Sequence, residues 1–213
     1  IEKLALELKQ QFLVKLWVQE FGLTKNKKMF RAFRRFIKRL CKRPIYTHTK
    51  KPKGTLVFNF DSRTNKNLKS LHPKAQSEFV KLMEIAVKVA DTYGVNVKII
   101  SGNRTYEEQQ KIYDQGRKTP GPIVTKAKPG FSRHNFGLAA DFGVFRNGKY
   151  LDAIDSNFTK KIYRGIYNNA EADNLKIEWG GNWKWQDPPH FEYKTGLSLA
   201  QLRSAKENNI SFI

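Results

Sequence analysis

The amino-acid sequence predicts an α+β domain in which helices flank a small antiparallel sheet, with a basic helical segment in front of it. Several stretches repeat apolar residues at helical spacing, and they alternate with short runs rich in β-branched residues. Gly and Pro separate these stretches, and no internal repeat is visible. The 213 residues suffice for one medium domain with an appendage, divided into 1–45 (basic amphipathic helical segment), 46–58 (linker) and 59–213 (domain).

The first 45 residues predict two amphipathic helices. The first covers residues 1–21, where apolar side chains recur about one turn apart, and Gly22 is suited to end it. The second covers residues 24–43, with phenylalanines on one side and basic residues over much of the rest, and Pro44 ends it. The stretch 50–54, Lys-Lys-Pro-Lys-Gly, has the composition of a linker.

Three helices are predicted in the remainder of the chain. Residues 73–93 carry apolar side chains at helical spacing, and Gly94 closes this helix. Shorter helices are predicted over residues 107–115 and 159–172. Residues 120–130, rich in Pro and Gly, predict a loop.

Four short segments predict the strands of the sheet. Residues 95–100 are apolar and rich in β-branched side chains, and residues 138–145 form a similar run. Residues 175–179 and 190–193 are shorter. Short strands alternating with two or three helices favour an antiparallel sheet.

The net charge is +21, and it is unevenly distributed. Residues 1–53 hold 16 Lys and Arg against 3 acidic residues, and the other 160 residues hold 24 against 16. Such a positive field implies an anionic partner, which could be nucleic acid, a membrane surface or the phosphate-bearing polymers of a bacterial envelope. Charge alone does not choose among these.

Cysteine content and hydropathy exclude several classes of protein. Cys41 is the single cysteine, which excludes an intramolecular disulfide and a Cys-based structural zinc site. No run approaches the roughly 20 apolar residues of a membrane span. Because acidic residues interrupt the first turns of the chain, we expect no secretory signal.

Two motifs far apart in the sequence carry the residues of a hydrolytic metal site. The stretch 132–141, Ser-Arg-His-Asn-Phe-Gly-Leu-Ala-Ala-Asp, supplies His134 and Asp141, and the stretch 187–190, Asp-Pro-Pro-His, supplies His190. Two neutral imidazoles and one carboxylate suit a zinc ion that keeps its fourth position open for water. A single histidine is more often structural than a ligand, but the paired motifs favour a zinc site.

These motifs resemble those of the zinc peptidases of the D-alanyl-D-alanine carboxypeptidase and dipeptidase group, peptidase family M15. Within that group the sequence most resembles the L-alanyl-D-glutamate peptidases found in phage endolysins and in some bacterial wall hydrolases. The resemblance spans roughly residues 59–193, and it includes Ser-Gly-Asn-Arg-Thr at 101–105 and Glu-Trp-Gly-Gly-Asn-Trp at 178–183. It implies the fold shared by Hedgehog domains and D-Ala-D-Ala peptidases, and Zn²⁺ held by His134, Asp141 and His190.

The resemblance also assigns roles to residues around the metal. The general base falls at Asp187, with Glu178 as a competing candidate that we interpret as structural. Arg104 matches an arginine that stabilises charge developing on the scissile carbonyl oxygen. Ser132 and Gln109 match substrate-binding positions, although each could equally be a helix cap or a packing residue.

Other polar and aromatic residues near the motifs have weaker assignments. Glu192 is expected to point to the opposite face of its strand from His190, and therefore not to be a ligand. Trp179, Trp183 and Trp185 could wall a peptide groove, or they could be packed in the core or at its rim.

The sequence therefore predicts a zinc-dependent, phage-type peptidoglycan hydrolase that cuts the stem peptide, most simply between L-alanine and D-glutamate. A D-alanyl-D-alanine carboxypeptidase or dipeptidase is the alternative enzyme, and a non-catalytic zinc-containing binding module is the second alternative. The expected partners are peptidoglycan and, through residues 1–45, anionic membrane or envelope polymers, whereas nucleic acid is not expected. We expect a monomer made in the cytoplasm of a bacterial host and acting at the cell wall or periplasm.

Overall fold

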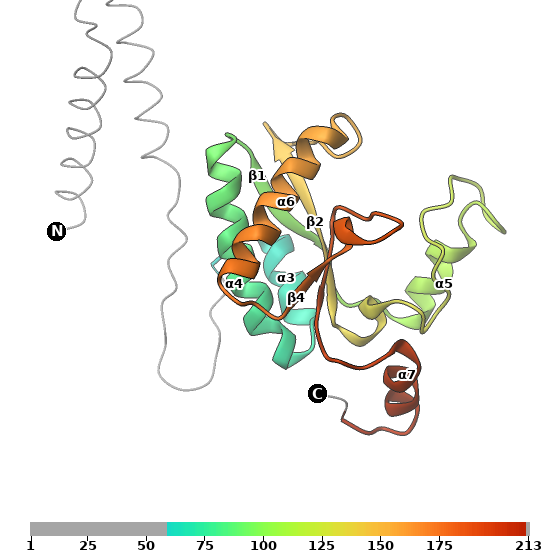
Figure 1. Ribbon diagram of the computed structural model, residues 1–213. Helices are drawn as coiled ribbons and strands as arrows, with labels where there is room; N and C mark the ends of the chain where they lie inside the picture. The colour runs from blue at the N-terminus through green and yellow to red at the C-terminus, as the bar shows by residue number, and fades with distance from the viewer. Residues whose placement is uncertain (1–58, 212–213) are drawn as a thin grey trace, which may run out of the picture. The chain divides into compact units, whose positions relative to one another are not determined.

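The computed structural model describes residues 59–211, which form a five-stranded antiparallel sheet with helices packed against it (Figure 1). This arrangement confirms the predicted α+β fold class. The helical segment at 1–45 and the linker at 46–58 lie outside the described residues and stay predictions.

The three helices predicted in the domain are present as α4 (Pro73–Thr92), α5 (Tyr106–Asp114) and α6 (Ser156–Ala172). Their starts are set by side chains that satisfy free backbone N–H groups. At α5, the Thr105 hydroxyl accepts a hydrogen bond from the Glu108 N–H at 3.1 Å, and the Glu108 carboxylate accepts one from the Thr105 N–H at 2.8 Å. This capping box fixes where α5 begins, directly after the segment that carries Arg104.

Two helices were missed by the sequence patterns, α3 (Ser62–Ser70) and α7 (Leu199–Glu207). Leu68 is the single apolar residue that α3 buries, and Leu202 is the single one that α7 buries. One buried apolar side chain produces no helical repeat, so hydrophobic periodicity could not reveal either helix. Both helices instead begin at polar N-cap residues, Asp61 for α3 and Ser198 for α7.

The sheet has the strand order β1-β2-β5-β4, and a short β3 (Lys149–Tyr150) pairs with β2 outside this path. The four predicted strands are present as β1 (Asn96–Ser101), β2 (Ala139–Arg146), β4 (Ile177–Trp179) and β5 (His190–Tyr193). All of their pairings are antiparallel, as predicted. The central pair, β2 and β5, joins segments that are about 50 residues apart in the sequence.

Alternation along the strands separates a core face of the sheet from a site face. On β2 and β5, apolar side chains point into the core cluster: Ala140, Phe142, Val144 and Phe191. The residues between them point to the other face, where Asp141, His190 and Glu192 line a pocket.

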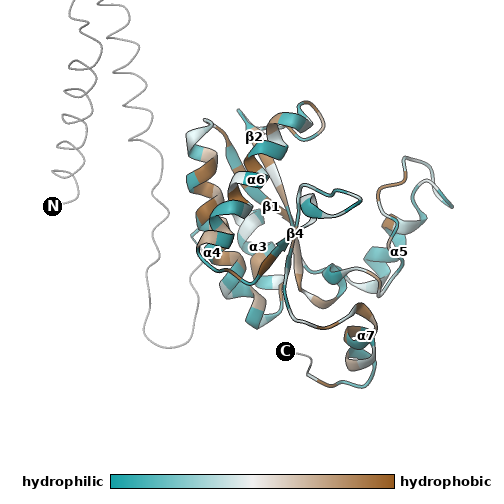
Figure 2. Cartoon of the chain, viewed as in Figure 1, coloured by the Kyte–Doolittle hydropathy of each residue, from teal (hydrophilic) through white to brown (hydrophobic). Residues whose placement is uncertain are grey.

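The core face is covered by α3, α4 and α6, whereas α5 and α7 lie on the other side of the sheet (Figure 1). Apolar and polar residues alternate along α4 (Figure 2), which is consistent with one side of this helix facing the core. Tyr163 of α6 is fully buried, and its hydroxyl donates to the Asp152 carboxylate at 2.6 Å. None of the helices within 59–211 combines the length and hydrophobicity needed to span a bilayer.

Gly137 joins the turn that carries His134 to strand β2, and an alanine there should destabilise the fold more than its backbone conformation alone explains. Gly137 has φ of 66°, and an added Cβ would lie 2.7 Å from the backbone nitrogen of His72. Gly94 has almost the same φ, 65°, with nothing within 4 Å of an added Cβ, so Gly94→Ala is a matched control. We expect Gly94→Ala to lower the free energy of unfolding by about 1–2 kcal/mol. Gly137→Ala should lower it by about 1–3 kcal/mol more, because the neighbouring backbone must move.

Urea unfolding of both variants in the presence of a metal chelator measures these costs without a contribution from metal binding. Equal costs for the two variants would contradict the tight packing described at Gly137.

Candidate metal centre

His134 lies in η1 (Arg133–Phe136), a short 3-10 turn that leads into β2. The turn ends at Gly137, whose left-handed conformation redirects the chain into the strand. The His134 ring is 3% exposed, and its Nδ1 lies 2.7 Å from the carbonyl oxygen of Gly102. Because a carbonyl oxygen only accepts hydrogen bonds, Nδ1 carries the proton of the neutral ring. The Nε2 atom is therefore free to bind a cation through its lone pair.

Asp141 and His190 face each other across the paired strands β2 and β5. They are 49 positions apart in the sequence, yet the register makes them direct partners, and His190 Nδ1 lies 3.0 Å from Asp141 Oδ1. Since directly opposed residues of an antiparallel pair project to the same face, the strand pairing itself brings an imidazole and a carboxylate together.

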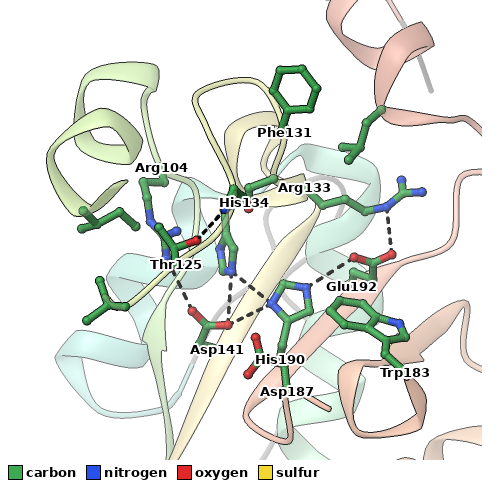
Figure 3. Close-up of a pocket in the computed structure, with 15 residues that line it drawn as sticks. Arg104, Thr125, Phe131, Arg133, His134, Asp141, Trp183, Asp187, His190 and Glu192 are labelled. Atoms are coloured by element: carbon green, nitrogen blue, oxygen red, sulfur yellow. Dashed lines mark hydrogen bonds and ion pairs between the residues drawn. The ribbon is translucent and has the colours of Figure 1, made fainter. Parts of the chain in front are cut away.

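Three donor atoms converge at this point: Nε2 of His134, Nδ1 of His190 and Oδ1 of Asp141 (Figure 3). The two nitrogens are 3.3 Å apart, and they lie 3.2 and 3.0 Å from the carboxylate oxygen. Ligand atoms held at the usual bond lengths around a tetrahedral zinc ion are about 3.3 Å from one another. The three donors therefore have both the chemistry and the spacing of one face of a tetrahedral metal site. We call His134, Asp141 and His190 the metal group.

The electrostatics of this group favour an added positive charge. Burial raises the pKa of Asp141, but the two histidines outweigh burial and hold this pKa well below its usual range. Burial lowers the pKa of His190, but hydrogen bonds to Asp141 and Glu192 outweigh it and raise this pKa to about 10. A proton on His190 or a metal ion between the three donors supplies the positive charge.

Asp187 lies in the loop before β5 and lines the same pocket. Two contacts hold this loop: the Asp187 N–H donates to the Gly180 carbonyl at 3.0 Å, and the Trp179 indole N–H donates to the Pro188 carbonyl at 2.7 Å. An added Cβ at Gly180 would lie 2.6 Å from the Asp187 carbonyl oxygen, so a side chain there would displace the loop. Partial desolvation raises the pKa of Asp187, and the Asp141 carboxylate adds to this effect against the opposing influence of His190.

Arg104 reaches the site from the segment between β1 and α5. One of its terminal nitrogens lies 3.6 Å from Asp141 Oδ2 and donates to the Ser101 hydroxyl at 3.0 Å. The other donates to Gln109 Oε1 at 2.9 Å. The side chain is 18% exposed and lines the pocket. Arg104 is thus a fixed cation beside the metal group.

Gln109 and Ser132 were both expected near the substrate, and the structure places them differently. Gln109 is fully buried and does not line the pocket; its amide donates to the Ala127 carbonyl at 2.7 Å and accepts from Arg104. A substrate could contact Gln109 only if the loop that carries Ala127 opened. Gln109 therefore lies behind Arg104, as seen from the pocket. Ser132 precedes η1, makes no capping hydrogen bond and lines the pocket.

Glu192 corrects one prediction from the sequence. It was expected on the opposite face of the strand from His190, but residues two apart in a strand share a face, and Phe191 is the residue that points to the core. Glu192 lines the pocket, and its Oε2 lies 3.3 Å from His190 Nε2. Its Oε1 forms an ion pair with Arg133 at 2.8 Å.

The three tryptophans considered as groove walls lie in three different environments. Trp179 is fully buried and stacks between Tyr167 and Phe191, so it belongs to the core. Trp183 lines the pocket, and its indole N–H donates to Glu178 at 2.9 Å. Trp185 is 75% exposed and is not among the residues that line the pocket. Glu178 also lies outside the pocket lining, in agreement with its interpretation as a structural residue.

The pocket around the metal group has a volume of about 680 Å³. Its floor is charged, and apolar residues of distant segments form part of its wall: Ile112, Val124, Phe131 and Leu199. The sequence patterns gave no reason to select these residues, because they come from α5, a loop and α7 and carry no motif. Arg133 was missed as well, although its position beside His134 was a usable signal.

The chain is similar to known proteins over more than half of its length. The family model for VanY, D-alanyl-D-alanine carboxypeptidase, matches residues 68–195. The peptidoglycan L-alanyl-D-glutamate endopeptidase CwlK of Bacillus subtilis (strain 168) is 37% identical over 126 residues, which are 57% of this chain and 72% of that protein.

Two solved structures resemble the fold at a lower level. The L-Ala D-Glu endopeptidase ChiX of Serratia marcescens is 25% identical with a TM-score of 0.44, and the match covers 63% of this chain and 88% of that one. The vancomycin resistance D,D-pentapeptidase VanY, a mutant in complex with Zn(II), is 17% identical with a TM-score of 0.41, covering 67% of this chain and 81% of that one.

The family resemblance predicted from the sequence motifs is thereby confirmed. The family match, over residues 68–195, contains the three metal donors as well as Arg104 and Asp187. This chain belongs to the VanY family of D-alanyl-D-alanine carboxypeptidases, a group of metallopeptidases.

Proposed function

We propose that this chain is a zinc-dependent peptidase that hydrolyses the stem peptide of peptidoglycan at the bond between L-alanine and D-glutamate. The observation that carries this proposal is the convergence, in one pocket, of the three metal donors with Asp187 and Arg104. Metal-assisted hydrolysis of a peptide bond uses a Lewis acid, a proton acceptor and a stabiliser of negative charge on the carbonyl oxygen. The pocket contains a residue suited to each of the last two tasks, and donors suited to hold the first.

Zinc is the ion that fits these donors best. Two imidazoles and one carboxylate with donor spacings near 3.3 Å suit a tetrahedral site with one position left for water. His134, Asp141 and His190 would hold the ion, and the Gly102 carbonyl already fixes the tautomer of the first of them. When bound, zinc polarises the scissile carbonyl and lowers the pKa of a water molecule.

Asp187 is the residue we assign as general base. Its carboxylate lines the pocket next to the metal group (Figure 3), where it can take a proton from the attacking water and give it to the leaving amine. Burial raises the pKa of Asp187 in the site without a metal, which is the direction that favours a carboxyl group able to hold a proton and return it. The loop contacts at Gly180 and Trp179 keep it in place.

Arg104 is assigned to the negative charge that develops on the carbonyl oxygen. Gln109 and Ser101 hold its guanidinium in one orientation, so little reorganisation is needed when the charge appears. Gln109 thus acts by positioning Arg104, and Ser132 at the pocket wall is assigned to substrate binding.

The choice of bond rests on the relatives. CwlK, the relative at 37% identity, is an L-alanyl-D-glutamate endopeptidase, and this supports the same cut here. The family's own description, D-alanyl-D-alanine carboxypeptidase, supports release of terminal D-alanine as the alternative. A non-catalytic zinc module would need neither Asp187 nor Arg104 in the pocket. The endopeptidase and carboxypeptidase reactions would use the same metal group, and the shape of the pocket decides between them.

The roles proposed for the metal group and for Asp187 are separable by substitution. Asp187→Ala should retain one equivalent of zinc and lose turnover by roughly 10²–10⁴-fold, because it removes the proton acceptor alone. His134→Ala and His190→Ala should lose zinc itself along with activity, since each removes one of three protein ligands. Zinc content by elemental analysis and hydrolysis of purified peptidoglycan provide the two measurements.

Glu178→Ala is the matched control for Asp187→Ala, because this carboxylate lies close to the pocket but outside its lining. Near-normal hydrolysis by Asp187→Ala together with loss of hydrolysis by Glu178→Ala would transfer the role of base to Glu178.

A phage-type lytic role is a further proposal for the enzyme. Binding to an anionic surface is a separate proposal, and it concerns residues outside 59–211. We propose that residues 24–43 bind anionic envelope polymers or membrane, each basic residue adding about 1 kcal/mol near such a surface. Replacing seven basic residues of the full chain by Gln should abolish co-sedimentation with anionic liposomes, the seven being Lys27, Lys28, Arg31, Arg34, Arg35, Lys38 and Arg39. Binding by the unmodified chain should weaken with salt and be absent on neutral liposomes. Undiminished binding by the neutralised chain would refute this role.

A further inference from the structure

His134 and His190 each have a charged residue within two positions in the sequence, and these two charged residues contact each other. Arg133 directly precedes His134, and Glu192 lies two residues after His190. Arg133 Nε is 2.8 Å from Glu192 Oε1, and the two side chains are 19% and 11% exposed. This ion pair therefore joins the turn that carries one histidine to the strand that carries the other (Figure 3).

The second oxygen of Glu192 contacts the ring of His190. Glu192 Oε2 lies 3.3 Å from His190 Nε2, while His190 Nδ1 faces Asp141 and His134. A neutral histidine that binds a cation through Nδ1 carries its proton on Nε2. The Nε2–H group can then donate to Glu192, and this contact selects the tautomer that leaves Nδ1 available.

Each guanidinium nitrogen of Arg133 has a partner within the protein. Its Nη1 donates to the Thr195 hydroxyl at 3.2 Å, and its Nη2 donates to the Leu197 carbonyl at 3.0 Å. All three guanidinium nitrogens thus have partners, and the planar group is fixed from two sides. Arg133 lines the pocket, and its three contacts are to Glu192 and to the segment that follows β5.

We infer that Arg133 and Glu192 are positioning residues for the metal site: Arg133 holds Glu192, and Glu192 holds the His190 ring with Nδ1 directed at the metal. The inference rests on the proposed metal role of the three donors, and it is independent of which peptide bond is cut. Their inferred role is to orient a metal ligand, and it requires no contact with the substrate. Their effect should therefore appear first in metal affinity.

Glu192→Gln tests the inference with a nearly isosteric change. Gln keeps an oxygen that can accept from His190 Nε2–H, but it lacks the charge that pairs with Arg133 and can rotate its amide the other way. We expect zinc affinity, measured by competition with a chromophoric chelator, to fall about 10–100-fold, the usual effect of losing an outer-shell partner. Glu192→Ala should lower affinity at least as far, and Arg133→Lys, which loses the planar fork, should lower it as well.

Glu78→Gln is the matched control. Glu78 has a side-chain exposure of 15%, an ion pair with Lys81 and a hydrogen bond from the Lys176 N–H, and it lies on α4, away from the metal group. Its variant should lose stability in the metal-free form without a change in zinc affinity. Comparing melting temperatures of the metal-free variants separates a loss of folding from a loss of metal binding.

The tautomer of His190 provides a readout that general destabilisation would not change. In the zinc-loaded protein, nitrogen NMR of the ring should show a protonated Nε2, and this proton should exchange faster in Glu192→Ala. Zinc affinity of Glu192→Gln and Glu192→Ala within twofold of the unmodified chain would overturn the inference. A failure of the proposed function would look different, since the unmodified chain itself would then bind no zinc, or would bind zinc and release nothing from peptidoglycan.

Discussion

The pairing of β2 with β5 is the interaction on which the site depends. Its register sets Asp141 opposite His190, and the same alternation sends Ala140, Phe142 and Phe191 into the core. One set of backbone hydrogen bonds therefore fixes the apolar interior and the metal-binding face together. A shift of one residue would exchange these two faces, burying the carboxylate and exposing the phenylalanines. Burial of the apolar face therefore fixes the strand register, and the register fixes the positions of Asp141 and His190.

The remaining parts of the site are held by contacts to this strand pair. His134 enters on a turn that Gly137 ends, and the Gly102 carbonyl orients its ring. The Asp187 loop is held by Gly180, which accepts from the Asp187 N–H, and by Trp179, which donates to the carbonyl of Pro188, the residue after the proposed base. The Asp141 carboxylate and the imidazoles of His134 and His190 thus lie close together, and a cation bound between them would balance the carboxylate charge. Binding of a metal ion by these donors would therefore be coupled to folding.

The sequence predicted those features that depend on local pattern. Helical spacing located α4 and α6, and motif order selected His134, Asp141 and His190. It missed α3 and α7 because one buried apolar residue each leaves no repeat. Gln109 and Trp179 show a second limit, since burial depends on segments that pack against them from elsewhere in the chain. Glu192 shows a different kind of miss. Residues two apart in a strand lie on the same face, so the alternation of side chains was enough to place Glu192 beside His190, and the prediction of the opposite face was wrong.

The central claim is that the metal-loaded site cuts the stem peptide. Mass spectrometry of fragments released from purified peptidoglycan by the zinc-loaded chain tests it most directly. We expect stem peptides that begin at D-glutamate and glycan chains that keep L-alanine. Release of D-alanine alone would contradict the endopeptidase assignment and favour the carboxypeptidase. Release of nothing by a chain with zinc confirmed bound would contradict the claim of catalysis altogether.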